Sequence, residues 1–260
     1  MSTAAALTVF TDPEGAAQAV AETFIETLSD ALAHQDYAHV VLTGGSMGIR
    51  SLEAIAAHPR LLDLDWSRVH IWWGDERWVP AESEDRNDKQ ADDALLSRLP
   101  LNPDKIHRMP AAGAGIDLDH AALSYADELY RVHGGTARRT PEFDILLLGV
   151  GPDGHIASLF PGHAQVYDKA EGAVPVYDSP KPPAERISLT LPTINRAKHV
   201  WFVAAGPDKA TAVHLALRGL WFVDLPASGA KGTLSTRWFV DELAAAELDD
   251  DLRAEYEENA

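Results

Sequence analysis

Residues 143–163 read FDILLLGVGPDGHIASLFPGH, an apolar run that passes directly into a glycine-rich turn. The run FDILLLGV is typical of a strand that is buried on both faces. Similar runs, among them HVVLTGGS, RVHIWW, RISLTL and HVWFVAA, alternate with longer amphipathic stretches along the rest of the chain. This alternation predicts an α/β layered fold whose strands are parallel and buried.

Helices are expected where apolar residues recur at a helical period. The clearest begins at Asp12-Pro13, a cap followed by a first helical residue, and carries an apolar stripe from Ala17 to Leu32. Further helices are expected over 47–57, 87–96 and 118–132. The stretches between these elements lack the length and composition of interdomain linkers, so residues 1–260 are predicted to form a single domain.

The composition argues against several classes of function. The chain has no cysteine, which excludes thiolate metal sites and cysteine nucleophiles. Its formal net charge of −18 argues against a nucleic-acid partner, because phosphate backbones are bound by clustered Lys and Arg. No window reaches the roughly 20 apolar residues of a membrane span, the amino terminus lacks a secretory pattern, and no metal-ligand spacing such as H-E-x-x-H occurs. We expect a cytoplasmic protein that uses neither a metal nor a cofactor and that has no membrane partner.

In open α/β sheets ligands bind beyond the carboxyl ends of the strands, so polar and glycine residues directly after an apolar run are the first candidates for a site. One such place is Thr43-Gly44-Gly45-Ser46, between a predicted strand and a predicted helix. Glycines allow a close approach to the backbone, and a helix start offers free N–H groups, which suits a phosphate. The alternative is an ordinary strand-to-helix turn.

Charged residues follow or open three other runs. The segment GDER, 74–77, comes directly after HIWW and places Asp75 and Arg77 at one strand end. The alternative for this pair is a salt bridge at the rim, of little energetic value. Arg186 opens RISLTL and Lys209 follows HVWFVAA, and both are placed to add positive charge to a phosphate site.

The turn GVGPDGH, 149–155, matches the G-x-G-x-x-G fingerprint of dinucleotide-binding proteins. We reject that function because Pro161-Gly162 interrupts the helix that a βαβ unit would need. The turn is interpreted instead as presenting Asp153 and His155 at the start of a short helix. A helix start disfavours imidazolium, so His155 is predicted to be neutral and able to accept a proton, with either Asp153 or Asp75 orienting it.

Together these segments resemble the 6-phosphogluconolactonase family. The similarity runs through nearly the whole chain, in LTGGS, WWGDERWVP, LLLGVGPDGHIASLFPGH, RISLTLPTIN, VAAGPDKA and WFVDELAA. The resemblance implies a three-layer, Rossmann-like α/β/α fold with a mostly parallel central sheet, as in glucosamine-6-phosphate isomerase/deaminase. It also implies hydrolysis of a phosphorylated sugar lactone, 6-phospho-D-glucono-1,5-lactone, to 6-phosphogluconate. We expect a monomer or a small homo-oligomer.

The resemblance also implies roles for individual residues. It makes His155 the general base that activates water, and it places Asp75 and Arg77 in the active site. It puts the phosphate on the turn and on the basic residues, namely Thr43, Gly44, Gly45, Ser46, Arg186 and Lys209. Arg86 is assigned to the same substrate-binding set, although its stretch PAESEDRNDKQA departs from the His-Ser-Asn pattern of some members.

Two other functions are weighed against this one. Deaminase relatives also carry a D-G-H turn, but their ring-opening site reads GHIAFNEP with a glutamate before the proline, where this chain has Phe160. A sugar-phosphate sensor would need an output domain, and no helix-turn-helix segment with a basic face flanks the core. The sequence therefore favours the lactonase.

Overall fold

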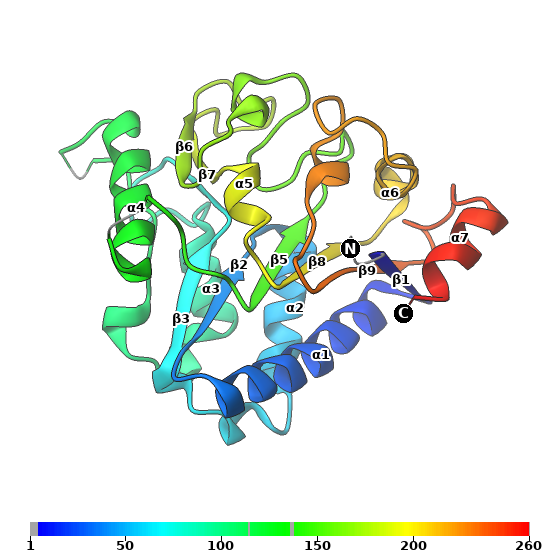
Figure 1. Cartoon of the computed structure of the whole chain (residues 1–260), viewed down its shortest axis with the longest axis horizontal. Coiled ribbons are helices and arrows are strands. Elements are labelled where there is room, and N and C mark those ends of the chain that lie inside the picture. The colour runs from blue at the N-terminus through cyan, green and yellow to red at the C-terminus, as the bar shows by residue number, and fades with distance from the viewer. Residues whose placement is uncertain (1–4, 114, 136–137, 260) are drawn as a thin grey trace.

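The computed structural model describes residues 5–113, 115–135 and 138–259. Its central sheet has six strands, and every neighbouring pair is parallel (Figure 1). In spatial order they are β1 (Ala5–Phe10), β9 (Ser235–Asp241), β8 (His199–Ala204), β5 (Ile145–Gly149), β2 (Ala38–Leu42) and β3 (Val69–Trp73). The α/β fold with a mostly parallel central sheet is thereby confirmed.

The predicted buried strand lies in the interior of this sheet. Strand β5 runs between β8 and β2, and its residues 145–148 are fully buried. A strand that has helices or a second sheet on both faces keeps apolar side chains on both, which is why FDILLLGV lacks the alternation of a half-exposed strand.

Helix α1 (Pro13–His34) shows how the sequence specifies an element. The Asp12 carboxylate accepts a hydrogen bond from the N–H of Gly15 at 2.8 Å, and Pro13 occupies the first turn. A cap of this kind stabilises a helix by about 1 kcal/mol. The predicted apolar stripe is buried against the sheet and against α2 (Gly45–Ala57).

The other helices are α3 (Asn87–Ala94), α4 (Leu118–His133), α5 (Leu191–Ile194), α6 (Ala210–Leu217) and α7 (Asp250–Glu257). The helices expected over 47–57, 87–96 and 118–132 correspond to α2, α3 and α4, with ends shifted by one or two residues. None of the helices within the described ranges combines the length and the apolar character needed to cross a membrane.

A second, antiparallel sheet of three strands lies beside the first. It contains β4 (Asp75–Arg77), β7 (Arg186–Leu189) and β6 (Ala173–Val176), and α4 packs against β6 and β7. The expectation that RISLTL joins the parallel strands was wrong. Gly74 explains the change, because its N–H donates to Leu42 of the central sheet at 3.0 Å while its carbonyl accepts from Leu189 at 2.8 Å. The chain therefore passes from one sheet to the other at this residue.

Candidate active site

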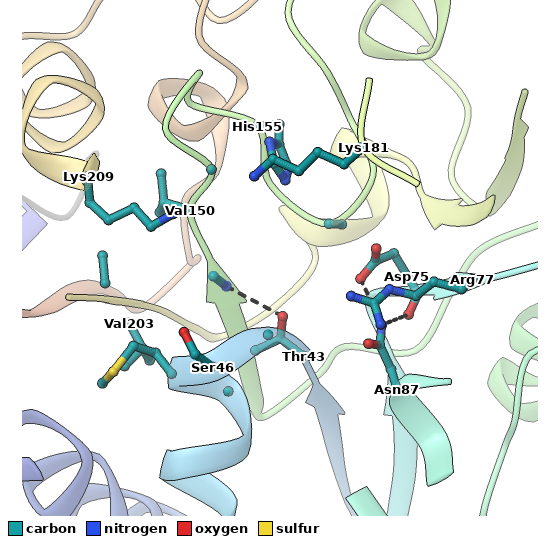
Figure 2. A pocket seen from close by; sticks show the side chains of 18 of the residues that line it. Thr43, Ser46, Asp75, Arg77, Asn87, Val150, His155, Lys181, Val203 and Lys209 are labelled. Carbon is teal, nitrogen blue, oxygen red and sulfur yellow. Dashed lines mark hydrogen bonds between the residues drawn. The ribbon is translucent and has the colours of Figure 1, made fainter. Parts of the chain in front are cut away.

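A cavity of about 240 Å³ opens at the carboxyl ends of β2, β5 and β8 (Figure 2). Its wall is formed by the segment 43–48 after β2, by β4, by the turn after β5 and by the segment 203–209 at the end of β8. This is the place where ligands bind in open α/β sheets. Most of the predicted site residues line it: Thr43, Gly44, Gly45, Ser46, Asp75, Arg77, His155, Arg186 and Lys209.

The glycine turn after β2 presents backbone N–H groups to this cavity. Gly44 is the N-cap of α2, and no side chain caps the helix. A Cβ atom on Gly44 would lie 1.9 Å from Oδ1 of Asn87, so only glycine fits there. Free N–H groups and the positive end of the helix dipole make such a turn suitable for a phosphate.

His155 is held by Asp153. Its Nδ1 lies 2.5 Å from Oδ1 of Asp153, and the imidazole side chain is 15% exposed. An ionised carboxylate only accepts hydrogen bonds, so Nδ1 carries the proton and Nε2 of the neutral ring is the basic nitrogen. This contact decides the alternative that the sequence left open, because Asp153 and not Asp75 contacts His155.

The carboxylate of Asp153 stays ionised down to low pH. Partial burial favours its neutral form, but the hydrogen bond and charge of His155 and the backbone N–H donors outweigh burial and lower the pKa of Asp153 to about 2. The turn is tight as well as charged, since a Cβ atom on Gly151 would lie 2.0 Å from Nδ1 of His155.

The expected short helix after His155 is absent from the described structure. Residues 156–160 form turns and an isolated bridge between Ile156 and Leu159, and Ala157 has a positive φ of 47°. This left-handed residue, two positions after His155, stops a helix from propagating. The argument that a helix dipole keeps His155 neutral therefore does not apply, and Asp153 is the group that orients the ring.

Asp75 belongs to a different network. Its Oδ2 accepts a hydrogen bond from the Ser158 hydroxyl at 2.7 Å and lies 3.9 Å from Nη1 of Arg186. The Asn87 amide donates to the Asp75 carbonyl at 2.9 Å. Oδ1 of Asn87 is buried in the cavity wall without a hydrogen-bond partner among the described residues, which leaves an acceptor for a ligand hydroxyl.

The basic side chains of the cavity differ in how they are held. Nη1 of Arg77 donates to the carbonyl of Asp85 at 2.5 Å, and Nζ of Lys209 lies 2.9 Å from Oδ2 of Asp208. Arg186 is buried, and its donors reach the backbone carbonyls of residues 181–183 at 3.0 to 3.3 Å. The fourth basic residue of the wall is Lys181.

Arg86 does not line the cavity. It is buried, and its guanidinium forms a bidentate pair with Asp88, both bonds 2.8 Å long, while Nη2 also donates to the carbonyl of Met109. The expected role of Arg86 in phosphate binding has no geometric support, because Arg86 is buried away from the cavity wall and only its Nη1 lacks a partner among the described residues. Arg86 lies directly before α3 and anchors that helix start.

Glu76 reaches the same helix start. It accepts hydrogen bonds from the N–H groups of Asn87 and Asp88 at 2.7 and 2.9 Å. Burial raises the pKa of Glu76 to about 7, against the lowering effects of Arg86 and of those N–H donors. The two acidic residues of GDER thus have different tasks, since Asp75 faces the cavity and Glu76 fixes α3 beneath it.

Asn87 and Lys181 are cavity residues that the sequence did not assign. Asn87 carries a weak signal, because it begins a predicted helix shortly after GDER. Lys181 lies in the stretch YDSPKPPAE between two strands, where no motif or periodicity distinguishes a ligand from a surface lysine. Among the described residues, no group of three or more His, Asp or Glu side chains is arranged to hold a metal ion.

Comparisons with known proteins agree on one family. The family model described as glucosamine-6-phosphate isomerases/6-phosphogluconolactonase matches residues 11–238. A 6-phosphogluconolactonase of Streptomyces coelicolor is 46% identical over 95% of this chain and 96% of the relative. The corresponding protein of Mycobacterium leprae is 42% identical over 94% of this chain and 98% of the relative.

Solved structures show the same likeness. The crystal structure of 6-phosphogluconolactonase from Thermotoga maritima aligns with a TM-score of 0.79 and 26% identity, and the alignment covers 91% of this chain and 99% of the other. A monomeric glucosamine-6-phosphate deaminase aligns with a TM-score of 0.75 over 93% of this chain and 99% of the other, at 20% identity. The deaminase is similar in fold alone.

Proposed function

The chain belongs to the glucosamine-6-phosphate isomerase/6-phosphogluconolactonase family, and from this premise we propose that it is a 6-phosphogluconolactonase. It is a carboxylic ester hydrolase that converts 6-phospho-D-glucono-1,5-lactone to 6-phosphogluconate, the second step of the oxidative pentose phosphate pathway. Relatives of that name, 41–46% identical to this chain over at least 92% of its length, support the assignment.

The proposed reaction uses His155 as the general base. A water molecule loses a proton to Nε2 of His155 as its oxygen attacks the lactone carbonyl, and the carbonyl oxygen becomes negatively charged. When the bond between the carbonyl carbon and the ring oxygen breaks, imidazolium returns the proton to the ring oxygen. Asp153 stabilises the imidazolium and keeps the tautomer, and Arg77 or backbone N–H groups of the turn 149–155 stabilise the oxyanion.

One observation gives this mechanism its main support. His155, which is held by Asp153, lines the same cavity as an uncapped helix start with two glycines, so in this proposal a base and a phosphate-binding turn face one space. In this proposal residues 43–46 hold the phosphate together with Arg186 and Lys209. Asp75 and Asn87 face the sugar hydroxyls.

The environment of His155 favours the lactonase over the deaminase. The ring of Phe160 lies 4.5 Å from that of His155 and is buried, so an apolar ring occupies the position where the deaminase motif has a glutamate. The deaminase motif would pair its histidine with that acid. Here the acidic partner of the histidine is Asp153.

Lactone hydrolysis by the purified protein tests the proposal. The lactone is generated in situ, the rate above spontaneous opening is recorded, and glucosamine-6-phosphate deamination is measured in parallel. His155→Ala is expected to lower kcat by about 10²–10⁴-fold, the usual contribution of a general base, while KM changes little.

His34→Ala is the matched control, since that side chain is 75% exposed on α1. Full activity of the His155 variant would exclude this residue as the base. A wild-type protein that deaminates glucosamine-6-phosphate and leaves the lactone untouched would overturn the assigned reaction.

We further propose that the protein acts in the cytoplasm as a monomer or a small homo-oligomer. Light scattering after gel filtration measures its molecular mass and so tests the oligomeric state.

A further inference from the structure

On the basis of the proposed function, we propose that Lys181 is a further substrate-binding residue, whose ammonium group binds the phosphate of the substrate together with Lys209. The two side chains belong to different parts of the chain. Lys181 lies in the loop 177–185 between β6 and β7, and Lys209 lies directly before α6. Both line the cavity, and Figure 2 shows them extending into it from different sides.

The backbone that carries Lys181 is held firmly. The carbonyl of Lys181 accepts hydrogen bonds from the Ser179 hydroxyl at 2.8 Å and from Nη2 of Arg186 at 3.0 Å. The N–H of Ser179 also donates to the carbonyl of Ala184 at 3.0 Å, which closes the loop at its base. A fixed backbone with an exposed, flexible side chain directs the ammonium over the cavity, and the side chain can still adjust to a ligand.

Among the described residues, no protein group pairs with the ammonium of Lys181, unlike the other basic residues of the cavity. Arg77, Arg186 and Lys209 each contact an oxygen of the chain. The described residues offer Nζ of Lys181 no carboxylate within 4.0 Å. The ammonium group of Lys181 is therefore available to a ligand in the cavity.

The charge of the cavity suits a phosphate. Four basic side chains line it against one carboxylate, that of Asp75, so the wall carries an excess of positive charge. A phosphate dianion carries two negative charges and is bound in proteins by Lys and Arg side chains of this kind.

The charge of Lys181 acts on the acidic partner of Lys209. The pKa of Asp208 lies below its ordinary value, mainly because of its hydrogen bond to Lys209, and the charge of Lys181 contributes in the same direction. Lys181 and Lys209 therefore act on one carboxylate and line one cavity. A cation in this position binds the phosphate in the ground state and the transition state alike, so its loss should affect KM and not kcat.

The experiment compares Lys181→Met with Lys181→Arg on two substrates, 6-phosphogluconolactone and the unphosphorylated D-glucono-1,5-lactone. Lys181→Met is expected to raise KM for the phosphorylated lactone roughly tenfold or more, the effect of losing a charge-assisted contact, while kcat stays within about twofold. Hydrolysis of the unphosphorylated lactone should not change, and Lys181→Arg should retain most of the affinity. Lys231→Met, at an exposed lysine outside the cavity wall, is the control.

Binding of 6-phosphogluconate, measured by calorimetry, gives a second readout that does not depend on turnover. Lys181→Met should weaken it by a factor similar to the rise in KM. An inactive wild-type protein would overturn the proposed function, and the calorimetric comparison would still test Lys181. Unchanged 6-phosphogluconate affinity in Lys181→Met, or an equal loss of activity on both lactones, would overturn the assignment of Lys181 to the phosphate.

Discussion

The hydrogen bond between Asp153 and His155 determines which imidazole nitrogen can accept a proton. Asp153 is two residues from His155, and the turn between Gly151 and His155 is closed by a hydrogen bond from the N–H of Gly151 to the carbonyl of His155 at 2.9 Å. The two side chains are therefore paired within one five-residue turn. This is why the sequence could identify both members.

We predict that Asp153→Asn lowers kcat by about 10²–10⁴-fold, because an amide can donate to Nδ1 and so favour the wrong tautomer of the ring. KM for the phosphorylated lactone should change little, since Asp153 does not line the cavity. Steady-state kinetics check both values. Because the pKa of Asp153 is about 2, the wild-type rate should show no titration of this carboxylate above about pH 3. A variant with wild-type kcat would show that His155 does not need this partner.

At the scale of elements, the site depends on the contact between the glycine turn before α2 and the start of α3. Asn87, the first residue of α3, lies against Gly44 and donates to the backbone of Asp75. One side chain thus connects this glycine turn to the strand that carries Asp75 and Arg77. The sequence predicted both elements, but nothing in it showed that they meet here.

We predict that Gly44→Ala disrupts this contact. The new Cβ atom would lie 1.9 Å from Oδ1 of Asn87, so the amide must move and its hydrogen bond to Asp75 is lost. Removal of such a bond with its buried partner left in place costs about 1–3 kcal/mol, and we expect a lower melting temperature together with at least a tenfold loss of kcat/KM.

Gly15→Ala is the control for this substitution, because its Cβ atom would meet no atom closer than 3.5 Å in the first turn of α1. Wild-type melting and activity of Gly44→Ala would show that α3 moves to accept the side chain. The same result would remove the argument that only glycine fits at this position.

At the scale of the whole molecule, the limits of the sequence prediction follow from distance along the chain. Residues that a local turn or strand end brings to the cavity, such as those of 43–46 and His155, were predicted from the sequence. Asn87 and Lys181 reach the cavity only through the arrangement of whole elements, and Lys181 lies in a loop between two strands of a second sheet that the pattern of runs did not predict. Arg86 was assigned by analogy, and the fold gives it Asp88 as a partner instead.

The end of the central sheet opposite the active site contains a cluster of histidines. His39, His70 and His107 lie at or near the amino ends of β2 and β3, where the ring of His70 stacks on the other two with centroids 4.5 and 5.1 Å apart. His107 lies 2.8 Å from Glu128, and Lys105 and Arg131 line the same hollow.

Burial, the neighbouring imidazoles and Lys105 lower the pKa of His70 to about 3. Burial also lowers the pKa of His39 to about 4, although Asp144 opposes the shift.

This cluster predicts that the protein loses stability in mild acid. In the unfolded chain these imidazoles take up protons near pH 6.5, whereas in the folded chain they do so only near pH 3 to 4. Between these limits the unfolded state binds more protons, so the free energy of unfolding falls as the pH is lowered. Glu76 acts in the opposite sense between about pH 7 and 4.5, because its pKa is raised by folding.

The variant His70→Gln isolates the contribution of the cluster, since it leaves Glu76 unchanged. Urea unfolding at a series of pH values from 7 to 4.5 should give a shallower decline for His70→Gln than for the wild type. Because the difference between the two proteins is the quantity compared, the opposing effect of Glu76 cancels. Equal slopes would mean that the hollow admits enough water and counterions to let His70 protonate in the folded state. In that case the packing at the amino ends of β2 and β3 would accommodate a protonated His70, whereas we expect it to keep His70 neutral.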